Sequence, residues 1–276
     1  MRRTVCLLLV SLLLPFLAPH PAAEASAGTA TRVPTAMAST GDSITRAFNV
    51  GWCCAFQDSP ARSWSTGTSS TVLSHYRRLL AFDPRISGNA HNNAVRGARM
   101  SDLERQMRLS ASQGADYVTV EMGANDLCRS SIGSITPTST FKEQFRAALT
   151  AFVEARPQGR VLVASIPNLY QLWQLFRYDP VARSVWSTFG ICQTMLSANN
   201  TEAMRQQVVA REHELNNALR DVCAEFVARC RWDGYAVFHT EFSRSDVSTV
   251  DYFHPSTTVQ NRLSRVTWAA GYWPDR

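Results

Sequence analysis

The chain has 276 residues, 45% of them hydrophobic, and carries a formal charge of +6 at pH 7. This length is enough for one sizeable hydrophobic core, and most economically for one domain. The basic residues are scattered and almost all are arginines, with no basic run interleaved with aromatic side chains, which argues against a nucleic-acid-binding protein.

The first 27 residues are typical of a secretory signal peptide. Arg2-Arg3 gives a basic start, an apolar run follows over Val5–Leu17, and Ala25-Ser26-Ala27 supplies a cleavage site of small residues. An uncleaved anchor is the alternative, but the run is short for crossing a bilayer. We therefore predict a protein that is secreted after cleavage near Ala27, with no stable membrane anchor and a single domain over residues 28–276.

Six cysteines lie beyond this segment, at positions 53, 54, 128, 192, 223 and 230. An even number in an exported chain predicts disulfides, although the pairing stays open. Cys223–Cys230 is the easiest closure and Cys128–Cys192 the next, which leaves Cys53 and Cys54 with a strained direct bond. Because the chain has neither C-x-x-C nor H-E-x-x-H, we expect no metal and no cofactor.

Short apolar runs alternate with helical patterns, which is typical of a parallel sheet covered by helices. Strands are predicted at 33–39, 86–90, 117–122, 160–166 and 235–240, and helices at 70–81, 101–112, 140–155, 201–229 and 257–270. In such a sheet the functional residues lie beyond the carboxyl ends of the strands. The loops that follow the strands are therefore the places to search.

The loop after the first predicted strand reads Gly41-Asp42-Ser43-Ile44-Thr45. Gly41 permits a tight turn because it has no Cβ. Ser43 would then stand where the chain turns toward a helix, with backbone N–H groups directed at whatever its hydroxyl attacks. The same residues also suit an ordinary turn, so the functional interpretation depends on the later loops.

Two later loops offer hydrogen-bond donors. Gly97, just before a predicted helix, could present an unobstructed backbone N–H, although a glycine at a helix start needs no function. Asn125, in Gly123-Ala124-Asn125-Asp126, could turn its side-chain amide toward an oxygen on which negative charge develops. An Asx turn is the structural alternative for this asparagine.

The last loop, Asp251-Tyr252-Phe253-His254-Pro255, places a carboxylate three residues before a histidine. Pro255 restrains His254 to an extended backbone and suits the first turn of a helix. An imidazole with an acid within reach is the base and orienting group of a hydrolytic triad. The histidines at 75, 91, 213 and 239 have no such neighbour, so we expect them to be structural or superficial.

Together these stretches resemble the SGNH, or GDSL-type, hydrolases, with Ile44 where the family name has leucine. Gly41-Asp42-Ser43-Ile44 is similar to the first family block, Gly97 to the second, Gly123–Asp126 to the third, and Asp251 with His254 and Pro255 to the fifth. The resemblance implies a flavodoxin-like three-layer α/β/α sandwich with a mostly five-stranded parallel sheet. The sequence Gly123-Ala124-Asn125-Asp126-Leu127-Cys128 and the cysteine content look most like those of secreted bacterial members, including lipase-like and phospholipase-like ones.

The resemblance also implies a metal-free serine esterase. Ser43 would be the nucleophile, His254 the base and Asp251 its orienting acid, with an oxyanion hole made by Ser43, Gly97 and Asn125. The chain has no G-x-S-x-G sequence, which disfavours a standard α/β-hydrolase.

The substrate is a separate question. An aromatic-rich insertion at about 168–197 could wall an apolar site or simply pack on the body as a helical hairpin. We expect Trp52, Trp173 and Phe176 to bind substrate, a lipid or other apolar acyl ester, in a monomeric enzyme. The alternatives are a deacetylase for O-acetyl groups of a polysaccharide, with aromatic residues as sugar platforms, and a non-catalytic binding module, against which the intact Ser43, Asn125, Asp251 and His254 argue.

Overall fold

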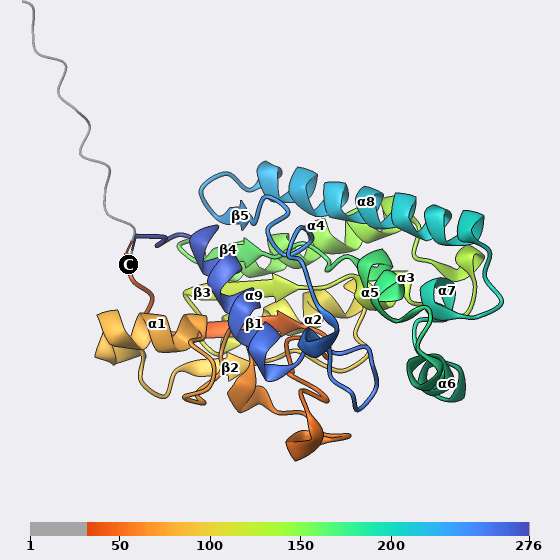
Figure 1. The fold of residues 1–276 in the computed structure, drawn as a ribbon. Coiled ribbons are helices and arrows are strands. Elements are labelled where there is room, and N and C mark those ends of the chain that lie inside the picture. The colour runs from red at the N-terminus through yellow and green to blue at the C-terminus, as the bar shows by residue number, and fades with distance from the viewer. Residues whose placement is uncertain (1–31, 276) are drawn as a thin grey trace, which may run out of the picture. The chain divides into compact units, whose positions relative to one another are not determined.

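The structure is a computed structural model that describes residues 32–275, so the predicted signal peptide lies outside the described residues. A five-stranded sheet has the order β2-β1-β3-β4-β5, and every pair of neighbours is parallel (Figure 1). The strands are β1 (Met37–Gly41), β2 (Ala90–Asn92), β3 (Tyr117–Glu121), β4 (Arg160–Val163) and β5 (Cys230–Trp232). This order places the change of winding direction between β1 and β3, where open sheets of this kind bind ligands.

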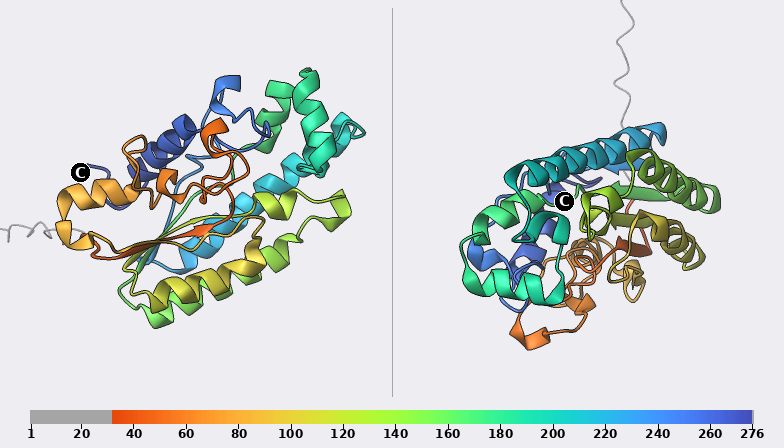
Figure 2. Two further views of the ribbon diagram at one scale, coloured as in Figure 1. Left: turned by 90° about the horizontal axis from the view of Figure 1, so that it is seen from below. Right: turned by 90° about the vertical axis from the view of Figure 1, so that its right-hand side faces the viewer.

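Helices cover both faces of the sheet and complete three layers (Figure 2). On one face lie α2 (Met100–Ser112), α4 (Thr138–Ala155) and α8 (Glu202–Glu225), and on the other α1 (His75–Phe82) and α9 (Thr257–Ala269). Successive strand residues point to opposite faces, so Val118 and Val120 join the first group while Tyr117 joins the second. The predicted α/β/α sandwich is confirmed.

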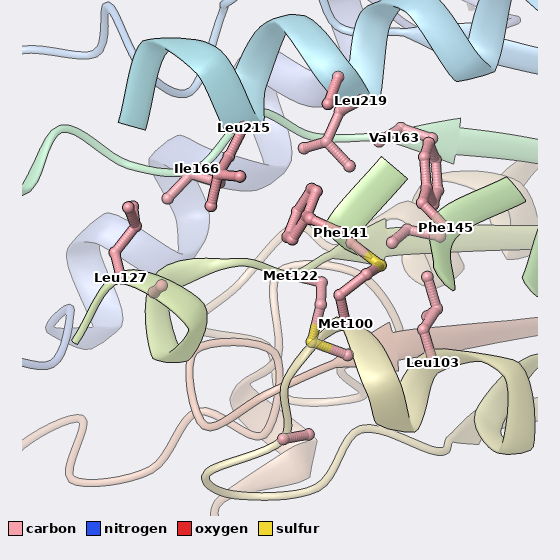
Figure 3. Close-up of a cluster of buried hydrophobic side chains, with 14 of the residues drawn as sticks. Met100, Leu103, Met122, Leu127, Phe141, Phe145, Val163, Ile166, Leu215 and Leu219 are labelled. Atoms are coloured by element: carbon pink, nitrogen blue, oxygen red, sulfur yellow. The ribbon is translucent and has the colours of Figure 1, made fainter. Parts of the chain in front are cut away.

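The larger part of the core lies between the sheet and α2, α4 and α8 (Figure 3). Phe141 and Phe145 of α4, four residues apart, point into this core with Leu215 and Leu219 of α8. All four side chains are fully buried. This packing fixes the layer that carries the carboxyl ends of β3 and β4, where the loops of the site begin.

The remaining helices are α3 (Ala124–Leu127), after β3, and α5 (Leu169–Phe176), α6 (Pro180–Phe189) and α7 (Gln193–Leu196), after β4. The last three helices occupy the segment at about 168–197 that we predict to be an insertion. None of the helices within residues 32–275 is long and apolar enough to cross a membrane.

The prediction of a fifth strand at residues 235–240 was wrong. Residues 235–240 form a turn, in which the Asp233 carboxylate accepts hydrogen bonds from the backbone of Tyr235 and Val237. The fifth strand is the shorter segment Cys230–Trp232. The second strand also lies later than predicted, because Pro84–Ile86 forms a 3-10 turn whose Ile86 is buried outside the sheet.

Candidate active site

The loop after β1 is held against its neighbours from two sides. Gly41 has φ +142°, and a Cβ at this position would lie 2.2 Å from the backbone oxygen of Glu121 on β3, so only glycine fits here. The buried Gln106 of α2 accepts a hydrogen bond from the Gly41 N–H at 2.7 Å and donates one to its carbonyl at 3.0 Å. The end of β1, and with it Ser43, is therefore fixed relative to β3 and α2.

Ser43, His254 and Asp251 lie in line at the carboxyl edge of the sheet. The Oγ of Ser43 is 2.8 Å from Nε2 of His254, and Nδ1 of the same ring is 2.6 Å from Oδ2 of Asp251. Since a carboxylate only accepts, Nδ1 carries the proton and Nε2 is left to accept from the serine hydroxyl. This geometry allows His254 to take the proton of Ser43 while Asp251 fixes the imidazole orientation.

The Asp251 carboxylate is buried but well supplied with hydrogen-bond donors. Burial by itself would raise its pKa, yet the hydrogen bond and charge of His254, with a further hydrogen bond from Asn49, hold that pKa below its ordinary value. Its other oxygen, Oδ1, accepts from the backbone N–H groups of Phe253 and His254, each at 3.0 Å. Asp251 is therefore kept ionised beside the imidazole.

The three residues predicted to form the oxyanion hole, Ser43, Gly97 and Asn125, all line one cavity. Within residues 32–275, the N–H groups of Ser43 and Gly97 have no hydrogen-bond acceptor. Asn125 is different, because its Nδ2 donates to Oδ2 of Asp42 at 3.1 Å and to the Ala98 carbonyl at 3.0 Å. A substrate oxygen would share or replace one of these bonds.

Behind the nucleophile lie two buried acids that the sequence interpretation did not single out. Burial raises the pKa of Asp42 to about 6, although the Ile44 N–H, His254 and Asn125 oppose the shift. Burial and the charge of Asp42 raise the pKa of Glu121 well above its ordinary value. The two carboxyls disfavour each other's ionisation, which limits the negative charge beneath Ser43.

A cavity of about 980 Å³ opens over Ser43. Apolar side chains contribute to its wall, namely those of Phe48, Phe56, Ala94, Val95, Phe189, Ile191, Val250 and Phe253. A charged side is formed by Asp58, which pairs with Arg46 at 2.9 Å and with Arg96 at 3.5 Å. The cavity thus presents both apolar and charged surface beside the serine.

Trp52, Trp173 and Phe176 are not among the described residues that line this cavity. Trp52 is 70% exposed and bonds to Thr249, whereas Phe176 is 2% exposed and packs on Trp186. The Arg205 guanidinium lies 3.6 Å from the centre of the Trp173 ring. The insertion reaches the cavity instead through Phe189 and Ile191, because most aromatic side chains of α5 and α6 pack on one another and on the core.

Two predicted disulfides are confirmed, Cys128–Cys192 and Cys223–Cys230. The first joins the segment after α3, next to Asn125, to the corner of the insertion beside Ile191. Cys53 and Cys54 carry free thiols, so the suggested third bond is absent. They lie in the 3-10 turn Trp52–Cys54, where the Cys54 sulfur accepts a hydrogen bond from Arg62 at 3.1 Å.

Further residues of the site were missed by the sequence interpretation, chiefly Gln106, Asn49 and the apolar wall. Gln106 meets Gly41 across 65 positions and Asn49 meets Asp251 across 202, so no local pattern marks either contact. Within the described part of the chain, no group of three or more His, Cys, Asp or Glu residues is placed to hold a metal ion.

Solved structures of low sequence identity share this fold. Phospholipase A1 from Streptomyces albidoflavus has a TM-score of 0.51 and 16% identity, over 86% of this chain and 99% of that one. A protein of Parabacteroides merdae described as a GDSL-like lipase has a TM-score of 0.53 and 14% identity, over 85% and 94%. A family two carbohydrate esterase from Clostridium thermocellum has a TM-score of 0.51 and 13% identity, over 86% and 64%.

Among curated protein sequences none matches this chain. Residues 40–261 match the sequence model of the GDSL-like lipase/acylhydrolase family, a range that runs from the end of β1 to α9 and includes every residue of the Ser43 site. Since the match covers most of the chain, the protein belongs to the GDSL-like lipase/acylhydrolase family and is a carboxylic ester hydrolase.

Proposed function

We propose that the protein is a secreted serine esterase that cleaves esters of apolar carboxylic acids through an acyl-enzyme on Ser43. The observation that carries the proposal is the line of Ser43, His254 and Asp251 at the floor of a partly apolar cavity. Export is supported by the amino-terminal sequence pattern and by two disulfides.

In the first half-reaction, Ser43 Oγ attacks the ester carbonyl carbon while His254 Nε2 takes the hydroxyl proton. The resulting tetrahedral intermediate carries its negative charge on the former carbonyl oxygen. When the carbon–oxygen bond to the alcohol breaks, the alcohol leaves with the proton from His254. A water molecule then attacks the acyl-enzyme with His254 as base, which releases the acid and restores Ser43.

The N–H groups of Ser43 and Gly97 would hold the oxyanion with the Asn125 amide. Both backbone groups lack an acceptor within residues 32–275, so a substrate oxygen would satisfy them without breaking an existing bond. Donors fixed before the reaction stabilise developing charge at little reorganisation cost. The Asn125 amide already donates to Asp42 and Ala98, so the oxyanion would share or replace one of these two hydrogen bonds.

The apolar side of the cavity supports an acyl chain as the group bound beside Ser43. Phe189 and Ile191 of the insertion and Phe253 of the His254 loop contribute to this side. Each methylene buried there gains about 0.8 kcal/mol. An acyl chain of several carbons would therefore bind more tightly than an acetyl group.

An O-acetyl esterase acting on a polysaccharide is the second candidate. It is favoured by the charged side formed by Arg46, Asp58 and Arg96 and by the exposed Trp52, which could stack on a sugar. One of the structures with this fold is a carbohydrate esterase. A binding module without activity is disfavoured, because the hydrogen-bonded line from Ser43 to Asp251 is complete.

A panel of p-nitrophenyl esters of increasing acyl length, with acetylated xylan alongside, separates these candidates. We expect kcat/KM to rise from acetyl toward medium-chain esters, with little acetate released from xylan. A strict preference for acetyl, together with acetate release from xylan, would favour the deacetylase. Absence of hydrolysis across the panel would contradict both.

A further inference from the structure

The segment that follows the nucleophile loop crosses to the loop that carries the histidine. Residues 49–57, the 49–57 loop, contact the 249–257 segment at three places. Nδ2 of Asn49 is 2.5 Å from Oδ2 of Asp251, the Thr257 N–H donates to the Val50 carbonyl at 3.2 Å, and Trp52 Nε1 donates to Thr249 at 3.0 Å. Only the first of these contacts involves Asp251, the acid of the proposed catalytic triad.

The orientation of the Asn49 side chain follows from its second partner. The backbone N–H of Phe56 can only donate, and it lies 2.6 Å from Oδ1 of Asn49. The amide nitrogen therefore faces Asp251 and donates to it. Asn49 is 3% exposed and has φ +53°, a left-handed conformation that asparagine tolerates better than most residues.

Oδ2 of Asp251 thus receives two hydrogen bonds, from Nδ1 of His254 and from Nδ2 of Asn49. Oδ1 is held by the backbone N–H groups of Phe253 and His254, and the two bonds to Oδ2 complete the set that fixes the rotation of the carboxylate plane. Removing the Asn49 donor would leave Oδ2 held by His254 alone, so the carboxylate could rotate about its Oδ1 contacts and the imidazole angle toward Ser43 would be less tightly fixed. Errors in the position of a reacting group of about 1 Å can lower rates about a hundredfold.

We propose that Asn49 is a positioning residue for the proposed catalytic triad of Ser43, His254 and Asp251. Its amide nitrogen fixes the Asp251 carboxylate beside His254, and its amide oxygen links this carboxylate to the cavity wall through the Phe56 backbone. This role rests on the proposed Ser43 mechanism and adds to it a residue outside the four family blocks. The link to Phe56 matters because Phe56 itself lines the cavity. One side chain therefore connects the substrate wall with the orientation of the general base.

The substitution Asn49→Asp offers a charge-dependent test of this role. The introduced side chain would have nearly the shape of the asparagine and could still accept from Phe56. Two carboxyls at hydrogen-bond distance share one proton, because both cannot easily ionise. While the pair holds that proton, the introduced carboxyl can donate to Asp251 as the amide does; once the proton is lost, the two groups repel.

Other charged groups near this pair are His254, on Asp251 itself, and Asp42, which acts on His254 from behind the nucleophile. Across the cavity, Arg46 and Arg96 are paired with Asp58. All of these groups are common to every Asn49 variant. A difference in pH dependence between two such variants therefore originates at position 49 and in its coupling to Asp251 and His254.

The experiment measures kcat, KM and thermal stability for the wild type, Asn49→Ala and Asn49→Asp from about pH 5.5 to about pH 9. We expect Asn49→Ala to lower kcat by roughly 10- to 100-fold with KM changed less than about threefold. The ratio of kcat/KM for Asn49→Asp over Asn49→Ala should fall at least about tenfold as pH rises. Asn216→Ala, at a buried asparagine whose side chain accepts from the Ile166 N–H, is the control and should lower stability without this pH dependence.

A wild-type kcat in Asn49→Ala, or a ratio that does not change with pH, would overturn the proposal. If Asn49→Ala does not fold, the ratio of Asn49→Asp to wild type carries the same test, since the fall at high pH is expected there too. Failure of the underlying function looks different: Ser43→Ala would then keep its turnover, whatever the Asn49 variants do.

Discussion

Asn125 donates its side-chain amide to the carboxylate of Asp42, the residue before the nucleophile, with 3.1 Å between Nδ2 and Oδ2. A donor from the β3 loop is thereby oriented by an acceptor from the β1 loop. The bond also means that an oxyanion would compete with Asp42 for the amide. Burial raises the pKa of Asp42 to about 6. Near that pH part of Asp42 is protonated, and the neutral carboxyl accepts the Asn125 hydrogen bond more weakly than the carboxylate does.

We expect Asn125→Ala to lower kcat by roughly 10²–10³-fold with a smaller effect on KM, as loss of one oxyanion donor does. Steady-state kinetics on a short-chain p-nitrophenyl ester give both constants. Asn199→Ala, at an exposed position outside the cavity, is the matched control and should leave both unchanged. A change confined to KM would make Asn125 a binding residue instead.

Phe189→Ala should flatten the dependence of kcat/KM on acyl length. Phe189 lines the cavity and is 63% exposed, so its loss should cost little stability. Four methylenes of an acyl chain in contact with an apolar wall stabilise the bound transition state by at most about 3 kcal/mol. Truncating part of that wall should therefore reduce the rise of kcat/KM with acyl length.

Trp173→Ala is the control for this series, because Trp173 does not line the cavity and packs beneath Arg205. It should reduce the melting temperature and leave the slope against chain length unchanged. A flattened slope in Trp173→Ala with an unchanged slope in Phe189→Ala would contradict the assignment of the wall.

For the cysteines, we expect two titratable thiols in unfolded, unreduced protein that lacks residues 1–27. These are Cys53 and Cys54, and peptide mapping should show Cys128 joined to Cys192 and Cys223 joined to Cys230. Reduction should lower both stability and activity, since the Cys128–Cys192 bond ties the segment beside Asn125 to the cavity wall. Peptides that join Cys53 to Cys54, with no free thiol, would contradict the structure at this loop.

The buried Glu212 of α8 should make the free energy of unfolding depend on pH. Its side chain is fully buried, and burial raises its pKa from 4.5 to about 8, opposed by a hydrogen bond from the Leu169 N–H. The unfolded chain therefore releases this proton more readily than the folded protein. The contribution of protonated Glu212 to the free energy of unfolding is complete below about pH 4.5. It falls by up to about 1.4 kcal/mol per pH unit as the pH rises toward about 8.

Glu212→Gln keeps an acceptor for Leu169 and removes the ionisation. Chemical denaturation at several pH values should therefore show a smaller loss of stability between about pH 5 and pH 8 in the variant than in the wild type. Parallel curves for the two proteins would show that Glu212 ionises normally in the folded state.

The sequence predicted the elements whose signals are local. The spacing of Phe141, Phe145, Leu149 and Phe152 marks α4, which spans Thr138–Ala155 against the expected 140–155. The four site stretches lie together because each follows a strand or begins a helix at one edge of a parallel sheet. Such positions can be inferred from the order of elements without knowing any tertiary contact.

What the sequence did not predict depends on contacts between distant residues. The segment 235–240 is apolar enough for a strand, but the buried Asp233 draws it into a turn through two backbone N–H groups. Trp173 and Phe176 are aromatic residues of the kind that line apolar substrate sites. However, a surface helix turns its apolar face toward the core, and the residue types alone do not show which side of the hairpin faces Ser43. Asn49 gave no signal at all, because its function lies entirely in a contact across 202 positions.

The central claim is that Ser43 is the nucleophile activated by His254. The direct measurement is labelling by a serine-reactive alkyl phosphonate followed by peptide mass mapping, with Ser43→Ala as the matched variant. We predict one phosphonylated residue, Ser43, with loss of esterase activity in proportion to labelling, and a Ser43→Ala protein that is folded, unlabelled and inactive; labelling at another residue, or full turnover in Ser43→Ala, would contradict the account.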